Sequence, residues 1–251
     1  MYLTEYFFAS GIKILYIVMK KLYVFGDIHG ELLKLENLLS KLNISADDTL
    51  IFLGDYVDRG PDSCGVIELL LRLKDKYQCI FIKGNHDHVF FTDVFYHGYN
   101  LGVNNMGYWS EGGKEALNSY QKAKMNPEEH LESFYRLLLP FYITDQKLFI
   151  HAGFNRSSPI NEQPDKNIFW FDRQLITDAH NFHFSQEITK LETFDNFDTI
   201  YIGHTPVQNW GYSMPCKWTN VWNLDTGSGK YQSGRLSCLE IDSETIYQSD
   251  F

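Results

Sequence analysis

Three short motifs rich in glycine, aspartate and histidine constrain most strongly how this chain can fold. They are GDIHG at 26–30, GDYVDRG at 54–60 and GNHD at 84–87, about thirty residues apart, and each follows an apolar run of strand-forming residues. Aspartate, asparagine and histidine offer the oxygen and imidazole ligands that divalent cations bind, and glycine lets the backbone turn where such side chains must converge. The three motifs together predict a metal site.

The segments between these motifs alternate between strand and helix patterns. We expect strands at 22–25, 49–53 and 79–82, and helices at 31–42 and 63–76, where leucines recur at helical spacing. Consecutive β-α-β units imply parallel strands joined by right-handed crossovers. Loops that leave the carboxyl ends of parallel strands gather at one edge of the sheet, so the three motifs should meet there.

The second half of the chain is expected to be rich in strands. A helical insertion at about 89–139 precedes it, with a last helix at 127–139, and the weakly periodic segment 155–197 is expected to be a long loop with short helices. Further strands are expected at 141–144, 147–150, 199–202, 221–224, 235–241 and 245–248. This alternation of helices and strands indicates an α/β protein.

Residues 1–18 differ from the rest of the chain. They are apolar and aromatic but are interrupted by Glu5 and Lys13. No basic segment precedes them, no small-residue cleavage site follows them, and they are too short for a membrane span. We expect them to be an N-terminal extension, or the product of an upstream start, before a single domain at 19–251.

The composition of the chain indicates which binding partners and which cellular compartment to expect. The 251 residues are 44% hydrophobic and carry a formal net charge of −10, without a cluster of lysine and arginine. This balance argues against a nucleic-acid-binding protein. None of the four cysteines belongs to a C-x-x-C pair, which favours a reduced, cytoplasmic protein, although one disulfide is still compatible with the sequence. We expect a monomer without a membrane partner.

Two more histidines, His151 and His204, follow predicted strands in the second half. With them the candidate metal ligands number six: Asp27, His29, Asp55, Asn85, His151 and His204. The first two would hold one ion, the last three would hold another, and Asp55 would lie between both ions. Two divalent cations about 3.5 to 4 Å apart repel each other by roughly 19 kcal/mol at an effective dielectric of about 20, so a bridging anionic ligand is required.

Ordinary explanations exist for each of these residues. Gly-Asp and Gly-Asn are common in turns, and a lone histidine beside an apolar strand is most often part of a packed core. Turn chemistry does not predict three such motifs after three successive strands, so we favour the metal site. His180 and His183 also have a ligand-like spacing, but no further ligand lies nearby in sequence, and we expect a packing or solvated role for them.

The ordered set of five motifs, which includes HAG at 151–153 and GHTP at 203–206, resembles the PPP family of serine/threonine protein phosphatases, within the calcineurin-like metallophosphoesterases. The resemblance covers 22–241. It implies an α/β fold with a central β-sandwich of mixed sheets flanked by helices (α/β/β/α), and a dinuclear metal site at the carboxyl ends of the strands. It also implies hydrolysis of a phosphomonoester, in a phosphorylated protein or peptide, by attack of a metal-bridging hydroxide. We expect two Mn²⁺ ions, with Fe or Zn as alternatives, because such ligands accept all three.

The resemblance also implies roles for residues that are not metal ligands. By position, His86 looks like the family's general acid, and Asp58 looks like the carboxylate that orients it. Arg59 looks like the arginine that grips the phosphate, because a guanidinium fork suits two phosphate oxygens. Asp225 belongs to a late motif to which we assign a supporting role.

Two departures from the family pattern affect the choice of function. The family's second arginine lies in a Trp-x-Arg element, whereas two residues separate Trp170 from Arg173 here; Arg173 is the expected match and Arg156 the alternative. Asp87 stands where eukaryotic members usually carry glutamate, and aspartate is common in bacterial members and in diadenosine tetraphosphate hydrolases. We expect a bacterial-type serine/threonine phosphatase. The alternatives are a dinucleoside tetraphosphate hydrolase or broad phosphoesterase, and a non-catalytic interaction module.

Overall fold

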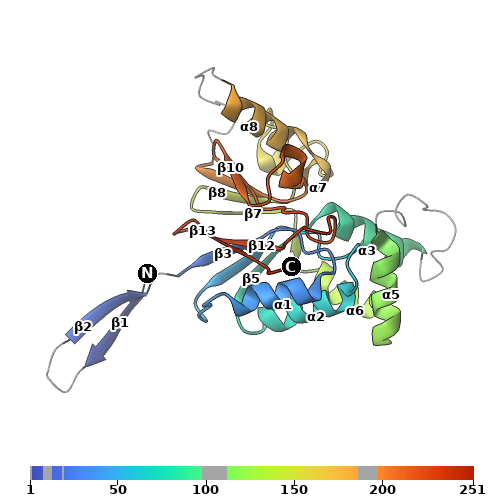
Figure 1. The fold of residues 1–251 in the computed structure, drawn as a ribbon, viewed down its shortest axis with the longest axis horizontal. Helices are drawn as coiled ribbons and strands as arrows, with labels where there is room; N and C mark the ends of the chain where they lie inside the picture. The colour runs from blue at the N-terminus through green and yellow to red at the C-terminus, as the bar shows by residue number, and fades with distance from the viewer. Residues whose placement is uncertain (1, 8–12, 19, 98–111, 186–196) are drawn as a thin grey trace.

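Two β-sheets that pack face to face form the centre of the computed structural model (Figure 1). The structure describes residues 2–7, 13–18, 20–97, 112–185 and 197–251. The larger sheet contains β3 (Leu22–Phe25), β4 (Thr49–Phe52), β5 (Gln78–Ile82), β6 (Leu138–Leu139), β12 (Ser237–Glu240) and β13 (Thr245–Gln248). Its strand order is β13-β12-β3-β4-β5-β6, and β3, β4 and β5 run parallel, as predicted for two β-α-β units.

The smaller sheet is mixed and carries the two later histidines. It contains β7 (Phe141–Thr144), β8 (Lys147–Ile150), β9 (Thr199–Ile202), β10 (Cys216–Trp218) and β11 (Val221–Asn223). Its order is β10-β11-β9-β8-β7, with β8, β9 and β11 parallel and the two edge strands antiparallel to their neighbours. The carboxyl ends of β8 and β9 lead directly to His151 and His204.

Helices cover the outer faces of both sheets (Figure 1). The larger sheet is covered by α1 (Leu32–Ser40), α2 (Ser63–Lys74), α3 (Asn85–His97), α5 (Lys114–Ala123) and α6 (Pro127–Tyr135). The smaller sheet is covered by α7 (Ile168–Phe171) and α8 (Gln174–Phe184), and short 3-10 helices lie at Ile160–Glu162 and Val207–Trp210. This α/β/β/α arrangement confirms the expected fold class.

A continuous apolar layer joins the two sheets. Val24 and Ile51 from the larger sheet pack there with Phe149 and Tyr201 from the smaller one, and the last two rings stack with their centroids 4.8 Å apart. Strands β3 and β4 are buried on both faces, and β5 is buried at Phe81 and Ile82, which explains why these segments read in the sequence as mainly apolar runs. The close packing fixes the two sheets relative to each other, and with them the loops at their carboxyl ends.

Residues 2–7 and 13–18 form a separate two-stranded antiparallel sheet. Its strands are β1 (Tyr2–Phe7) and β2 (Lys13–Val18), and in Figure 1 this hairpin extends away from the two packed sheets. The division into an extension and one following domain stays a prediction. Within the described ranges, no helix has both the length and the apolar character needed to cross a bilayer. All four cysteines, Cys64, Cys79, Cys216 and Cys238, are free, so the disulfide that the sequence allowed is not formed.

Two expected elements differ from the structure. The helix expected at 127–139 ends at Tyr135, because Leu138 and Leu139 pair with β5 as an edge strand and the residue before Pro140 disfavours helical backbone. The segment at 155–197, expected to be a long loop with short helices, does contain short helices, but one of them, α8, is 11 residues long and buries Leu175 against the smaller sheet. Within the expected helical insertion, 98–111 lies outside the described residues.

Candidate metal centre

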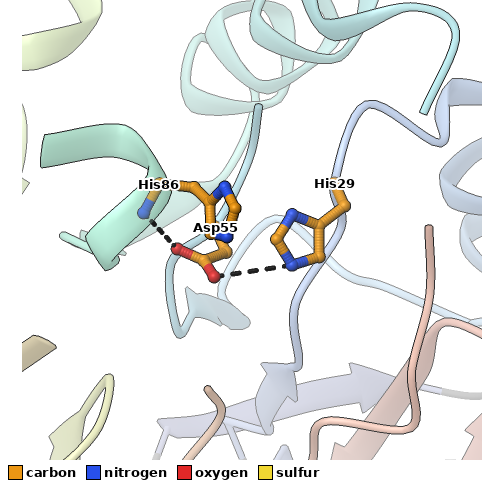
Figure 2. A group of neighbouring side chains, drawn as sticks. All are labelled: His29, Asp55 and His86. Atoms are coloured by element: carbon orange, nitrogen blue, oxygen red, sulfur yellow. Dashed lines mark hydrogen bonds and ion pairs between the residues drawn. The ribbon is translucent and has the colours of Figure 1, made fainter. Parts of the chain in front are cut away.

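The six candidate ligands lie at the carboxyl ends of strands from both sheets, five of them on loops and Asn85 at the start of α3. Asp27, His29, Asp55 and His151 are almost completely buried, with at most 2% of each residue exposed. Ligand atoms converge in two groups, within each of which they lie within 4.8 Å of one another: His29, Asp55 and His86 form one group, and Asp55, His151 and His204 form the other. Asp55 belongs to both groups, and Figure 2 shows it between His29 and His86.

Near the first group, the Nε2 atom of His29 lies close to two carboxylates. His29 Nε2 lies 3.4 Å from Asp55 Oδ2 and 3.9 Å from Asp27 Oδ2 (Figure 2 shows the former pair). His29 Nδ1 lies 3.1 Å from the Val57 carbonyl oxygen; because a carbonyl only accepts, Nδ1 carries the proton and Nε2 carries the lone pair. Burial, with the nearby charge of Arg59, lowers the pKa of His29 well below its usual value. A neutral imidazole and two carboxylates are suited to hold a divalent cation.

The second group is centred on Asn85. Its side-chain oxygen lies 3.1 Å from His151 Nε2 and 2.9 Å from His204 Nδ1, and His151 Nε2 lies 3.4 Å from Asp55 Oδ1. His151 Nδ1 lies 2.7 Å from the Leu53 carbonyl oxygen, which fixes the ring orientation and turns Nε2 toward the site. One carboxylate, one amide oxygen and two imidazoles therefore converge here, a donor set that fits Mn, Fe or Zn.

Cation binding at the second group is expected to release a proton from His151. Burial alone would lower the pKa of His151, but the carboxylates of Asp55 and Asp27 raise it to about 10. For His204, burial and the neighbouring His151 lower the pKa to about 3. Near neutral pH His151 is therefore protonated on Nε2 and the cation must displace that proton, so affinity should rise about tenfold per pH unit from about pH 6 to pH 9. Calorimetry in buffers of different ionisation enthalpy should detect at least one proton released; zero release would show that His151 is already neutral before the cation binds.

Strained backbone marks the site. Left-handed φ angles occur at five non-glycine residues of the motifs: His29 (51°), Asp55 (53°), Asp58 (72°), Arg59 (64°) and His204 (67°). Such conformations cost on the order of 1–3 kcal/mol each and tend to cluster at functional sites, where the surrounding structure enforces them. Backbone hydrogen bonds join the first two motifs, because His29 N–H donates to the Asp55 carbonyl at 2.8 Å and Gly60 N–H donates to the His29 carbonyl at 2.9 Å.

Asp87 has a structural role that the sequence analysis missed. Its carboxylate is fully buried and accepts backbone N–H groups from Asp55 at 2.8 Å, Tyr56 at 2.9 Å and Gly84 at 2.9 Å. The first two bonds tie the second motif to the third and hold the turn that presents Asp55, and the last closes the turn of the third motif itself. The only sign of this role in the sequence is the presence of an aspartate at position 87, which the motif comparison treats as a departure from the family pattern.

His86, a member of the first group, forms a buried pair with Asp58. His86 Nδ1 lies 2.8 Å from Asp58 Oδ2. Burial alone would lower the pKa of His86, but the carboxylates of Asp55 and Asp58 outweigh it and raise the pKa above its usual value. Arg59 spans two imidazoles: its Nη1 lies 2.6 Å from His29 Nε2 and its Nη2 lies 2.8 Å from His86 Nε2. Asp58, Arg59 and His86 are thus brought together, as their spacing in the motifs suggested.

The two candidates for the second arginine occupy different surroundings. Arg173 is exposed and immediately precedes α8; burial is the main cause of the low pKa of His204, and the charge of Arg173 contributes to it. Arg156 instead forms an ion pair with Asp178 of α8. The charge of Arg173 therefore acts on a metal ligand, His204, whereas the charge of Arg156 is paired with Asp178.

The remaining pair of ligand-like histidines does not join the site. His180 packs against Trp210 and Trp218, with ring centroids 5.3 and 4.9 Å away. His183 Nδ1 accepts the backbone N–H of Thr219 at 3.4 Å. His180 therefore has a packing role and His183 is exposed, which are the two roles expected for this pair.

Comparison with known proteins agrees with this geometry. The calcineurin-like phosphoesterase family matches residues 20–208. The chain belongs to this family, whose members use a dinuclear metal site, and it is a metal-dependent phosphoesterase.

Three similar proteins show how much of the chain the similarity covers in each case. Bis(5'-nucleosyl)-tetraphosphatase PrpE [asymmetrical] of Bacillus cereus (strain 03BB102) is 28% identical over 237 residues, which cover 89% of this chain and 92% of that protein. C06A1.3 of Caenorhabditis elegans, provisionally named a serine/threonine-protein phosphatase, is 39% identical over 66 residues, which cover 26% of this chain and 18% of that protein. A solved structure provisionally assigned as a diadenosine tetraphosphatase has a TM-score of 0.59 and 22% identity, covering 92% of this chain and 93% of that one; this likeness shows the fold alone.

Proposed function

We propose that this chain hydrolyses dinucleoside tetraphosphates asymmetrically, to a nucleoside monophosphate and a nucleoside triphosphate, in preference to phosphoserine or phosphothreonine esters. One observation carries the proposal. The similarity to the named tetraphosphatase extends over nearly the full length of both proteins, whereas the similarity to the named protein phosphatase is confined to 66 residues. Protein phosphatase activity is the second candidate, because identity within that shorter stretch is higher, at 39%.

In this proposal the two groups of ligands each hold one divalent ion. Asp27, His29 and Asp55 would hold the first ion, and Asp55 would also serve the second. Asn85, His151 and His204 complete the second site. When bound, the ions supply a water of lowered pKa and positive charge that stabilises the phosphoryl oxygens. The Val57 and Leu53 carbonyls, which fix the tautomers of His29 and His151, keep both Nε2 atoms directed at the ions.

The two arginines bind phosphate oxygens in this account. The terminal nitrogens of Arg59 contact the Nε2 atoms of His29 and His86, so the guanidinium fork lies directly beside the ligands. A cation on His29 Nε2 would take the place of one of these contacts, and the fork would then face the phosphoryl group that is attacked. Arg173 is exposed and its charge acts on His204, so we assign it to a neighbouring phosphate of a polyphosphate chain.

His86 donates a proton to the leaving oxygen in this account. Asp58 holds Nδ1, so Nε2 is the atom available to the substrate. Arg59 donates to the same Nε2, and two donors cannot face each other; Arg59 must therefore move to the phosphate before Nε2 can carry a proton. Binding of phosphate by Arg59 thereby prepares His86 as the acid.

A substrate comparison on the purified chain tests the proposal. With Mn²⁺ supplied, kcat/KM for diadenosine tetraphosphate should exceed that for a phosphoserine or phosphothreonine peptide by more than about tenfold, a difference of roughly 1.4 kcal/mol in transition-state binding. Chromatography should show AMP and ATP as products in equal amounts. A preference of the same size for the phosphopeptide would replace the proposal with the protein phosphatase, and two molecules of ADP would contradict asymmetric cleavage.

A further inference from the structure

Arg59 is held by two glycine-containing segments that are distant from it in sequence. Gly112 lies two residues before α5, and its carbonyl oxygen accepts the Arg59 backbone N–H at 3.2 Å. A second glycine, Gly229, packs close to both His29 and Arg59. The sequence analysis connected neither glycine to the site, because only the folded chain brings them there.

Gly112 comes too close to Arg59 for any side chain to fit between them. A Cβ at this position would lie 2.3 Å from Arg59 N and 2.7 Å from Arg59 Cα, and these backbone atoms cannot turn aside as the end of a side chain could. Gly112 also has a φ of 107°, a conformation that other residues rarely adopt. Both features require glycine at this position.

Gly229 makes the second close approach. A Cβ there would lie 2.6 Å from His29 Cβ and 3.5 Å from Arg59 Cβ, and the φ of Gly229 is 69°. The preceding hydroxyl, Ser228 Oγ, donates to the Ile28 carbonyl at 3.2 Å, which fixes this loop to the first motif. Arg59 thus has a packed neighbour on each side of its strained backbone.

The helix that follows Gly112 is anchored to the scaffold. Ser119 of α5 accepts the backbone N–H of Cys64 in α2 through its hydroxyl at 3.0 Å, and both residues are buried. Arg59 lies just before α2, and Gly112 lies just before α5. The hydrogen bond between these two helices therefore holds Gly112 next to Arg59. The position of Gly112 against Arg59 is therefore fixed by helix packing.

We infer that Gly112 is a positioning residue for Arg59. Its close backbone contact holds Arg59 at a φ of 64° and so directs the guanidinium toward the phosphate, which gives the helical segment beginning at Gly112 a role in the reaction. The inference rests on the proposed phosphate-binding role of Arg59. It does not depend on whether the substrate is a dinucleotide or a phosphoprotein.

The test compares Gly112→Ala with Gly211→Ala in the full chain. Gly211 also has a left-handed backbone, with a φ of 81°, but nothing lies within 4 Å of its added Cβ, so the control carries the backbone strain without the collision. With p-nitrophenyl phosphate as substrate, Gly112→Ala should raise the inhibition constant of inorganic phosphate about 10- to 100-fold, the loss expected for a charge-assisted hydrogen bond. Metal content should equal that of the wild type, and Gly211→Ala should leave the inhibition constant unchanged.

A double-mutant cycle separates positioning from a general loss of structure. Arg59→Ala should itself weaken phosphate inhibition, and adding Gly112→Ala to it should cause no further change, because both act through the same guanidinium. If a folded Gly112→Ala retains wild-type phosphate inhibition, the inference is wrong. If Arg59→Ala retains it, the proposed role of Arg59 fails instead.

A second variant keeps the test decisive if Gly112→Ala does not fold. Ser119→Ala removes the hydroxyl that anchors α5 to α2 and leaves Gly112 itself intact. It should also weaken phosphate inhibition, by a smaller factor, with metal content unchanged. Wild-type inhibition in this variant, together with a Gly112→Ala variant that fails to fold, would assign Gly112 to folding alone and overturn the inference.

Discussion

Replacing Asp55 with asparagine is expected to lower kcat/KM by about 10³-fold or more, which corresponds to several kcal/mol of lost metal-ion stabilisation. Asp55 Oδ2 faces His29 at 3.4 Å and Asp55 Oδ1 faces His151 at 3.4 Å, so this carboxylate belongs to both described groups of ligand atoms. Asparagine removes its negative charge and turns one of its oxygens into a donor. Metal content should fall from two ions to at most one.

The fold should survive this substitution. Asparagine tolerates the left-handed φ of 53° at position 55, and its amide oxygen can still accept the His86 backbone N–H that Asp55 Oδ1 accepts at 2.9 Å. Asp145→Asn is a matched control, because Asp145 is an exposed residue with a φ of 47° in the turn between β7 and β8. It should retain full activity and both ions. Two tightly bound ions and a normal rate in Asp55→Asn would show that Asp55 does not bridge the site.

Replacing His86 with asparagine should have an effect that depends on the leaving group. With a phosphoserine peptide, whose alkoxide leaving group needs a proton, loss of general acid catalysis should lower kcat by about 10²- to 10⁴-fold. With diadenosine tetraphosphate the leaving group is a nucleotide phosphate, a much weaker base, and the loss should stay below about tenfold. The ratio of these two losses measures proton donation by His86 independently of substrate binding.

Metal analysis of the same variant separates two possible roles of His86. Its ring lies close enough to His29 and Asp55 to be a ligand itself, because ligand atoms of all three lie within 4.8 Å of one another (Figure 2). A general acid held by Asp58 should leave both ions bound when it is replaced, whereas loss of one ion would make His86 a ligand. His183→Asn, an exposed histidine in the last turn of α8, provides the control and should change neither rate nor metal content.

The location of the site followed from local features of the sequence. Asp27, Asp55 and Asn85 come directly after β3, β4 and β5, and three adjacent parallel strands leave no other place for their loops than one edge of the sheet. His151 and His204 follow parallel strands β8 and β9 for the same reason. Because the signals of strand, turn and ligand coincide within a few residues, no long-range information was needed to bring these side chains together.

Features that depend on distant contacts could not be predicted in the same way. The contact between Gly112 and Arg59 joins segments separated by more than fifty residues, and the three bonds of Asp87 depend on the exact placing of two loops. Strand β10 has only three residues, too few to show an alternating pattern. The end of α6 at Tyr135 was set by strand pairing with β5, which a helical pattern does not reveal.

Substrate preference could not be predicted because the motifs describe the phosphoryl group and little else. In the proposed mechanism the metal ligands, His86 and Arg59 all act at the phosphorus atom that is attacked, and an ester and an anhydride both contain such an atom. The sequence analysis therefore favoured a protein phosphatase on its motifs, whereas similarity along nearly the whole chain favours the tetraphosphatase that it had named as the alternative. Residues outside the motifs determine which substrate fits.

Anomalous diffraction from crystals grown with Mn²⁺ tests the central claim most directly. The account predicts two peaks about 3.5 to 4 Å apart on either side of the Asp55 carboxylate, the spacing found in two-metal sites. One peak should contact Asp27 and His29, and the other should contact Asn85, His151 and His204. A single peak, or peaks that contact other residues, would contradict a dinuclear centre built from these six side chains.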